Sequence, residues 1–336
     1  MSESQVSLVI PGRNCASTIR LCLQAVVPML DSGRLREIIF VDDGSTDATA
    51  SIVGEFPVTR IAGSGRGPGA ARNVGWRAAR NSLVWFVDSD CVAEPDALDK
   101  LLPVMADPIV GGASGSYGIM NPHSLLACLI HEEIIERHRA MPSRVNFLAT
   151  FNVLYRRDAL EEVGGFDERY LKAQDAELSF RVMDAGYELR FVFDSRVKHF
   201  HEERWLGYLR TQRQQGYWRV WLHLTHKGHN VRDSYSNILD HGQPPLAILA
   251  LLSLPLLAAG RLGVIPAGLA ALLLLAQVPL TVRMVRRLRQ PRYLWFAWMG
   301  FLRAFWRGVG MTQGMVACAS ARIRKTTSPP TETTHG

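Results

Sequence analysis

Two pairs of carboxylates follow apolar runs in the first hundred residues. Asp88 and Asp90 follow LVWFV, and Asp42 and Asp43 end EIIFVDD. Residues two apart in a strand share a face, so Asp88 and Asp90 can converge if the strand geometry persists to its end. Carboxylates suit Mg²⁺ or Mn²⁺, whose remaining coordination positions substrate phosphates can fill. The spacing therefore indicates a divalent-cation site, and the simpler alternative is an acidic turn that caps a helix near Glu94.

The segments around these carboxylates are typical of nucleotide binding. An acid at a strand end can accept hydrogen bonds from a base N–H or a ribose hydroxyl. The stretch GSGRGPGAARNVG is rich in glycine and then places Arg72 and Asn73 at the opening of a helix. A pliable loop with an arginine near acids fits a nucleotide. A turn in which Asp47 caps the next helix, followed by a plain loop-to-helix junction, explains the same residues structurally.

The order of apolar runs and helical stretches predicts the sheet that carries these side chains. Unbroken runs of Val, Ile, Leu and Phe separated by helices indicate a parallel sheet covered on both faces. In such sheets ligands gather beyond the carboxyl ends of the strands, so both acid pairs are expected to face one cleft. Residues 111 to about 205 are expected to mix helix and strand. The strands are expected in 6–11, 37–45, 58–63 and 83–90, and the helices in 17–30, from about 47, and in 69–81.

Charge and cysteine usage narrow the class of protein. The net charge of +7 is uneven: residues from 283 onward carry +9 and the first 282 carry −2. The positive net charge comes from a basic segment next to an apolar one, so it does not indicate that the protein binds nucleic acid. The cysteines show no paired ligand spacing, which suits a reducing compartment and gives no zinc signature. The N-terminus lacks the pattern of a signal peptide, so the first domain is expected to stay cytosolic. The cysteines are Cys15, Cys22, Cys91, Cys128 and Cys318.

Two apolar segments in the second half predict membrane insertion. Residues 244–260 and 263–282 carry no charge and are nearly all apolar, and a spanning helix needs about 20 apolar residues. A buried core hairpin is the soluble alternative. The basic flank RMVRRLRQPR is expected on the cytoplasmic side, so two spans would return the chain to the side of its first domain. The expected location is therefore the cell inner membrane. Residues 293–318 are expected to form an interfacial amphipathic helix, with a third span as the rival.

Several ordered motifs resemble the family 2 glycosyltransferases with the GT-A fold. They are VSLVIPGRN, VDDGSTDAT, GPGAARNVG and VWFVDSDC, and residues 152–189 resemble the acceptor-side half of the same family. The resemblance spans roughly residues 5 to 220. It implies an α/β fold of the nucleotide-diphospho-sugar transferase type: a Rossmann-like mixed sheet with helices on both faces, followed by C-terminal transmembrane helices. The expected domains are a cytosolic GT-A domain in 1–225, a linker in 226–243, two transmembrane helices in 244–282, a basic segment with the interfacial or third helix in 283–325, and a disordered tail in 326–336.

The resemblance also implies roles for individual residues. The family's general base falls at Asp175, with Glu177 two residues on as a second catalytic candidate. Many relatives have Glu before that Asp, whereas this chain has Gln174. The cation, Mg²⁺ or Mn²⁺, would be held by Asp88 and Asp90. The donor site would comprise Pro11, Arg13, Asn14, Asp42, Asp43, Arg72, Asn73, Asp88 and Ser89, with Asp42 and Asp43 on the base and ribose.

Two further groups of residues have weaker signals. His199 and His201 stand at alternate positions after a strand-like run, and they can supply a metal ligand or a phosphate contact. An edge strand beside the membrane would show the same pattern. Three arginines in RTQRQQGYWRVW can contact diphosphate or lipid head groups, although a helix lying on the membrane is the preferred interpretation. They are Arg210, Arg213 and Arg219.

The pattern predicts a membrane-anchored inverting glycosyltransferase. It would use a nucleotide-sugar donor and a lipid-linked or glycan acceptor at the cytosolic membrane face. A dinucleotide-dependent oxidoreductase is a rival class, but the first strand is followed by only one glycine, in IPGRNCAS, and not by G-x-G-x-x-G. A second rival class is a scaffold protein that binds sugar nucleotides without catalysis. A processive polysaccharide synthase remains within the leading class, but two spans resemble an anchor more than a channel.

Overall fold

The computed structural model describes residues 6–226, 234–235 and 238–323. The chain forms two compact units, each built from two stretches of sequence. The first unit comprises residues 6–120 and 138–200, and the second comprises 121–137 and 201–323 within the described part. The expected boundary at residue 225 therefore differs from the observed division, because the segment 121–137 and the helix after residue 204 belong to the second unit.

A nine-stranded mixed sheet forms the centre of the first unit, in the order β3-β2-β1-β4-β8-β6-β9-β5, with β7 paired to β9. Strands β1, β2, β3 and β4 are mutually parallel, and β8 runs antiparallel to β4. The parallel part carries the expected nucleotide-binding edge. The strands are β1 Val6–Gly12, β2 Glu37–Asp42, β3 Thr59–Ala62, β4 Leu83–Val87, β5 Cys91–Ala93, β6 Val110–Ile119, β7 Arg144–Val145, β8 Asn152–Arg156 and β9 Glu188–His199.

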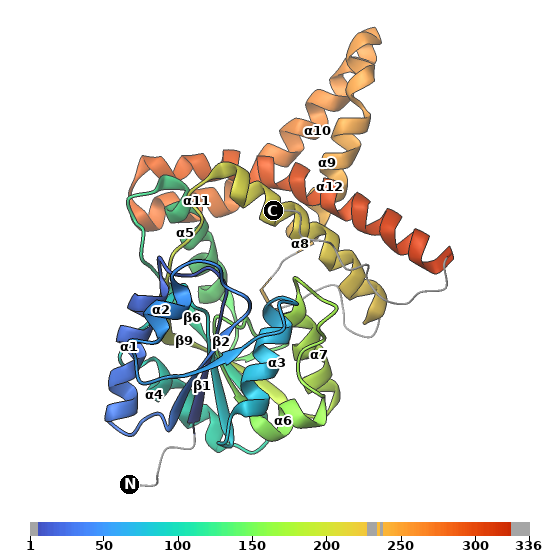
Figure 1. Ribbon diagram of the computed structural model, residues 1–336. Helices are drawn as coiled ribbons and strands as arrows, with labels where there is room; N and C mark the ends of the chain where they lie inside the picture. Colours follow the sequence, from blue (N-terminus) through green and yellow to red (C-terminus); the bar gives the residue numbers. More distant parts are fainter. Residues whose placement is uncertain (1–5, 227–233, 236–237, 324–336) are drawn as a thin grey trace. The chain divides into compact units, whose positions relative to one another are not determined.

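Helices cover both faces of this sheet (Figure 1). Successive side chains of a strand point to opposite faces of the sheet, so the core consists of two hydrophobic clusters. Leu8 and Trp85 belong to one cluster, whereas Val9 and Phe86 belong to the other. Helices α1 and α4 pack on the first face, and α3, α6 and α7 pack on the second. The bounds are α1 Ile19–Asp31, α2 Thr49–Val53, α3 Pro68–Ala78, α4 Ala97–Leu101, η1 Leu102–Ala106, α6 Arg157–Glu162 and α7 Gln174–Asp184. The expected elements in residues 6–90 are confirmed, within a few residues at their ends.

The second unit is helical. Its most extensive contact joins α8 to α12, whose backbones approach closely at Gly310: an added Cβ there would lie 1.8 Å from the Arg213 carbonyl oxygen. Helices α9 and α10 pack together as the two arms of a hairpin (Figure 1). The bounds are α8 Trp205–Thr225, α9 Ile238–Leu252, η2 Leu254–Ala258, η3 Gly260–Gly263, α10 Val264–Leu275, α11 Val278–Leu288, η4 Pro291–Leu294 and α12 Trp295–Ile323, while α5 Leu125–Ala140 lies partly in each unit.

A buried ion network ties the helices of the second unit together. Glu133 pairs with both Arg137 and Arg303, and Arg137 also pairs with Asp240 at 2.6 Å. Burial alone would raise the pKa of Glu133, but the arginine charges outweigh it and lower that pKa to about 2. Arg303 was expected on an interfacial helix. Its side chain instead lies inside this unit, 3 % exposed.

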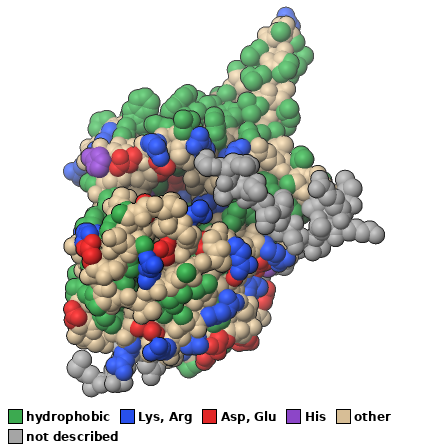
Figure 2. Space-filling model, viewed as in Figure 1, with side chains coloured by type: hydrophobic (Ala, Val, Ile, Leu, Met, Phe, Trp, Pro, Cys, Tyr) green, Lys and Arg blue, Asp and Glu red, His purple; other side chains and the backbone are tan. Residues whose placement is uncertain are grey.

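Apolar side chains cover the α9–α10 hairpin on its outer surface (Figure 2). Among the described residues, one helical stretch, Gly260–Leu288, is long and apolar enough to cross a membrane, which by length and composition alone is weak evidence. The expected second span lies within it. The expected first span, 244–260, is not one continuous helix, because α9 ends at Leu252 and a 3₁₀ turn follows. The expected tail, 326–336, lies outside the described residues, as does part of the expected linker.

Candidate active site

A tight turn follows β4 and separates the two carboxylates of the D-x-D motif. The strand ends at Val87, and the Cys91 amide donates to the Asp88 carbonyl oxygen at 3.0 Å. The strand geometry therefore does not persist to Asp90, and the condition for a shared face is not met. Each carboxylate instead has its own basic partner: Asp88 contacts Arg72, and Asp90 contacts His199.

Arg72 is held under the site with part of its hydrogen-bonding capacity unused. One guanidinium nitrogen, Nη2, donates to Asp88 Oδ1 at 2.6 Å, and the guanidinium lies 5.8 Å from the centre of the Phe166 ring. The side chain is only 4 % exposed. Its Nε and Nη1 atoms are buried without a hydrogen-bond partner in the part of the chain that the structure describes. Such donors are costly unless a ligand accepts from them, so this position suits an anion.

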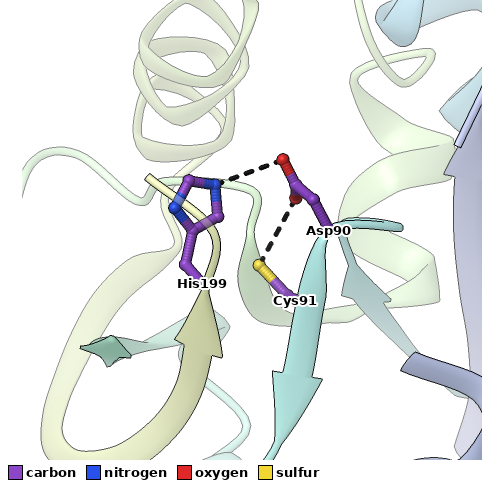
Figure 3. Close-up of side chains that lie close together, drawn as sticks. All are labelled: Asp90, Cys91 and His199. Atoms are coloured by element: carbon purple, nitrogen blue, oxygen red, sulfur yellow. Dashed lines mark hydrogen bonds and ion pairs between the residues drawn. The ribbon is translucent and has the colours of Figure 1, made fainter. Parts of the chain in front are cut away.

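Asp90, Cys91 and His199 form a compact group at the end of β9 (Figure 3). The Asp90 Oδ2 atom lies 3.2 Å from His199 Nε2, and the Cys91 thiol donates to Asp90 Oδ1 at 3.7 Å. Burial acts to raise the pKa of Asp90, but the hydrogen bond and charge of His199 outweigh it and leave that pKa below its ordinary value. An ionised carboxylate beside an imidazole is a suitable pair of ligands for a divalent metal.

Asp175 stands in the first turn of α7, after Ala173 in the left-handed conformation with φ of 62°. Its Oδ1 atom accepts from the Ala176 amide at 2.9 Å. Burial raises the pKa of Asp175; the Ala176 amide and the charge of Arg72 oppose this rise, and the charge of Asp88 adds to it. Asp175 therefore lies within range of the charges of Arg72 and Asp88. A carboxylate with a raised pKa is a stronger base than an ordinary aspartate.

The glycine-rich loop is fastened to the end of β2 by Asp43. The two carboxylate oxygens of Asp43 accept from the amides of Gly65, at 2.7 Å, and Gly67, at 2.9 Å. Both glycines have positive φ, 71° and 99°, which residues with a Cβ rarely adopt. Asp42, by contrast, accepts the Ser45 amide with one oxygen and lies 3.9 Å from Arg60 with the other. Asp42 is therefore the more available of the two for a nucleoside.

Asn73 has a structural role, although it was expected to line the nucleotide pocket. It is 1 % exposed, and its amide nitrogen donates to the Phe166 carbonyl oxygen and to Glu168. Its oxygen accepts from the Phe166 amide and the Trp76 indole. These bonds fasten α3 to the segment before α7, which positions Arg72 next to it.

Glu177 was expected to take part in catalysis, and its surroundings argue against that role. The side chain is 2 % exposed, and both carboxylate oxygens bind Arg181, at 2.6 and 2.5 Å. Arg181 also donates to the carbonyl oxygens of Val163 and Gly165. A carboxylate used in this way is poorly placed to take a proton from a substrate.

We therefore expect Glu177→Gln to act on stability. It should lower the free energy of unfolding by about 3 kcal/mol, because it leaves the Arg181 charge without its partner. Chemical denaturation of the purified chain measures this. Glu161→Gln is the matched control, because Glu161 forms an exposed pair with Arg157. If Glu177→Gln lost turnover while its stability was unchanged, Glu177 would take part in catalysis after all.

The remaining expected site residues have varied positions. Pro11 is buried in β1, and Arg13 follows that strand and is exposed. Asn14 has φ of 50° and accepts from the Thr46 amide, while Ser89 lies half-buried in the turn between the carboxylates. His201 belongs to the second unit, where its ring contacts His131 at 3.3 Å between nitrogens. Arg210, Arg213 and Arg219 lie on α8, the first two exposed and the third half-buried.

Cys91 is the site residue that sequence reasoning missed. It was grouped with the scattered cysteines because no second ligand stands at a regular spacing from it. Its proximity to His199 follows from the pairing of β5 with β9, which joins residues more than a hundred positions apart. Its position directly after the D-x-D motif was the one local signal available.

Comparison with known proteins agrees with this geometry. Residues 7–164 match the family model for glycosyl transferase family 2. The chain is 32 % identical over 204 residues to the probable glycosyltransferase YdaM of Bacillus subtilis, covering 56 % of this chain and 48 % of YdaM. It is also 32 % identical over 213 residues to the pre-mycofactocin glycosyltransferase of Mycobacterium tuberculosis, covering 60 % and 43 %. The chain thus spans about half the length of these relatives.

A solved structure shares the fold. The mannosyltransferase PcManGT from Pyrobaculum calidifontis, in complex with GDP-Man and Mn²⁺, superposes with a TM-score of 0.58 at 20 % identity. The match covers 93 % of this chain and 87 % of PcManGT. The expected fold, a mixed α/β sheet with helices on both faces, is confirmed.

Proposed function

The chain carries a glycosyltransferase domain of family 2, and we propose that it is an inverting enzyme that transfers a sugar from a nucleotide-diphosphate donor. Asp175 is its general base. The single observation that carries this proposal is the grouping of Arg72, Asp88 and Asp175: a buried guanidinium with unused donors is paired with Asp88, and its charge reaches the Asp175 carboxyl, whose pKa is raised. The Arg72 guanidinium suits the diphosphate of the donor, and the Asp175 carboxylate suits the hydroxyl of the acceptor.

The donor site is formed by the ends of β2, β3 and β4 and by helix α3. Asp42 is available to a base or ribose, and the glycine-rich loop held by Asp43 borders the same edge. Arg72 presents Nε and Nη1 toward an anion. Its bond to Asp88 holds the guanidinium in place before the donor arrives, so less conformational entropy is lost on binding.

The residues present fit a divalent cation, and we propose that Mg²⁺ or Mn²⁺ serves as cofactor. Asp90 and His199, 3.2 Å apart, offer an oxygen and a nitrogen donor, and Asp88 is near in the same turn. When bound, the cation neutralises charge on the leaving diphosphate. The solved structure of PcManGT, a complex with GDP-Man and Mn²⁺, supports this proposal.

In the proposed reaction Asp175 accepts the proton of the acceptor hydroxyl while that oxygen attacks the anomeric carbon. The attack comes from the face opposite the diphosphate, which inverts the configuration. Burial raises the pKa of Asp175 and strengthens it as a base. Arg72 stays bonded to Asp88 and donates to the departing phosphate oxygens, which stabilises the negative charge that develops there.

We further propose that the acceptor is lipid-linked or membrane-proximal and is used at the cytosolic face of the inner membrane. The supporting observations are the apolar stretch Gly260–Leu288 and the basic flank that follows it. An anchor of this kind would keep the catalytic residues near the surface where a lipid-linked hydroxyl is presented. A soluble acceptor that is turned over equally well without membranes would contradict this part of the proposal.

Donor binding to the detergent-solubilised chain tests the proposed function. UDP-, GDP- and dTDP-sugars are titrated calorimetrically with Mn²⁺ or Mg²⁺ and then with EDTA. We expect one donor to bind only when metal is present, and the Asp88→Ala/Asp90→Ala variant to lose that binding. Asp96→Ala/Asp99→Ala is the matched control, because it removes two exposed carboxylates from the same part of the chain. If no donor binds with either metal, the carboxylates form only a turn, and the proposed transfer from a nucleotide-sugar is wrong.

A further inference from the structure

The pairing of β5 with β9 places a sulfur atom beside the carboxylate and imidazole of the candidate metal site. Cys91 and His199 are direct partners in this antiparallel pair. Directly opposed residues in an antiparallel pair project their side chains on the same face of the sheet. One ligand atom each from Asp90, Cys91 and His199 lies within 4.8 Å of the other two (Figure 3).

This donor set differs from the one that the proposed sugar transfer requires. Mg²⁺ prefers oxygen ligands in a near-octahedral arrangement, and a thiol is a poor ligand for it. Thiolate, imidazole and carboxylate together are the ligands of tetrahedral Zn²⁺ sites, and soft ions such as Cd²⁺ share the preference for sulfur. Three protein ligands with a fourth position open is a common arrangement for Zn²⁺.

We propose that Cys91 makes this a three-donor site for thiophilic divalent ions. Zn²⁺ or Cd²⁺ binds the Asp90 carboxylate, the Cys91 sulfur and the His199 imidazole. Coordination replaces the thiol proton, which passes to the buffer, and no electron is transferred. The bound ion occupies the position proposed for Mg²⁺ or Mn²⁺ and so excludes them. That last consequence rests on the proposed function, whereas the binding of the thiophilic ion does not.

The exposure of the three side chains gives the ion a way in. Cys91 is fully buried, whereas the His199 and Asp90 side chains are 20 % and 44 % exposed. The ion is therefore expected to reach Asp90 first and His199 next, with the sulfur as the inner ligand. The exposed side of the Asp90 carboxylate leaves room for a water molecule as the fourth ligand.

Cys22, a second buried thiol, is a suitable control. Cys22 is fully buried and directs its Sγ atom to the Asp88 carbonyl oxygen at 3.8 Å. It does not belong to the group of three ligand atoms. Cys22→Ser therefore removes a buried thiol close to the site without removing a proposed ligand.

The test is a Cd²⁺ titration of the purified chain in detergent, without any sugar nucleotide. A sulfur-to-cadmium charge-transfer band in the ultraviolet reports directly on coordination by a thiolate. We expect one equivalent of this band in the native chain and in Cys22→Ser, and none in Cys91→Ser. His199→Gln, which keeps all thiols, should weaken Cd²⁺ binding by about tenfold or more, since even loss of a residue that supports a ligand costs about 10–100-fold.

A band that survives unchanged in Cys91→Ser, or that is unaffected by His199→Gln, would overturn the proposal. A parallel Mn²⁺ titration, followed by electron paramagnetic resonance, separates it from the proposed function. We expect Cys91→Ser to retain Mn²⁺ binding, and Cd²⁺ to displace Mn²⁺ from the native chain. A cadmium band without any donor binding would leave this inference standing while the glycosyltransferase proposal failed. Donor binding without a Cys91-dependent cadmium band would leave the glycosyltransferase proposal standing and overturn this inference.

Discussion

Asp175→Asn should lower kcat for sugar transfer by about 10²–10⁴-fold, the range that a positioned general base contributes. The amide has nearly the same shape as the carboxylate but cannot accept the hydroxyl proton. The hydrogen bond from the Ala176 amide can be kept by the side-chain oxygen, so α7 should begin as it does now. Steady-state kinetics, together with calorimetric donor binding, would show loss of turnover with donor affinity retained.

The matched control for this variant is Asp184→Asn, at the exposed far end of the same helix. It should leave both turnover and donor affinity unchanged. If Asp175→Asn lost donor binding in the same proportion as turnover, Asp175 would belong to the donor site and another group would act as base.

The pH profile provides a second measurement on the same residue. A general base works only when ionised, so kcat/KM should fall as the pH drops through the pKa of Asp175. Burial raises that pKa, and the acid limb should therefore lie above the value of about 3.9 expected for an ordinary aspartate. An acid limb at the ordinary value would contradict the assignment.

Arg72→Met should weaken donor binding by about 10²-fold or more, because a buried charge-assisted contact is worth about 2–5 kcal/mol when one partner is truncated. The substitution removes the two unused donors, Nε and Nη1, and leaves the charge of Asp88 without its partner. Methionine fills a similar volume against Phe166, so the packing beneath the site should be preserved. Donor titration and thermal unfolding, measured together, separate the two effects.

The same variant should also shift the pH profile. The charge of Arg72 lowers the pKa of Asp175, so its removal should raise that pKa and move the acid limb to higher pH. Arg77→Met is the matched control, one turn further along α3 and exposed. An unmoved acid limb in Arg72→Met would show that Arg72 and Asp175 are not coupled in the working enzyme.

Much of the fold could be predicted from the sequence because its signals are local. The runs in β1, β2 and β4 are unbroken and apolar, so they had to be buried on both faces. The acids that follow them had to stand at the carboxyl edge, where parallel strands end together. The sequence motifs also predicted the family whose model residues 7–164 match.

The partners of individual side chains could not be predicted, because they depend on contacts distant in sequence. Whether Asp88 and Asp90 converge depended on where β4 ends, and a turn gives each a different partner. Asp43 and Asp42 look equivalent in the sequence, yet the glycine-rich loop donates hydrogen bonds to the carboxylate of Asp43, whereas the carboxylate of Asp42 accepts from the Ser45 amide. Asp175 and Glu177, two residues apart at the start of α7, face different surroundings, and Arg181 takes up only Glu177.

The sequence by itself determined the apolar periodicity, the order of the elements and the chemical types available at the edge of the sheet, because each of these is written in neighbouring residues. The tertiary structure alone decided which groups meet. The register of β5 on β9 brings Cys91 beside His199, and the packing of α3 and α7 brings the charge of Arg72 within range of the Asp175 carboxyl. The physical reason is that a register and a packing angle are chosen by the whole core at once, through burial of side chains from several elements.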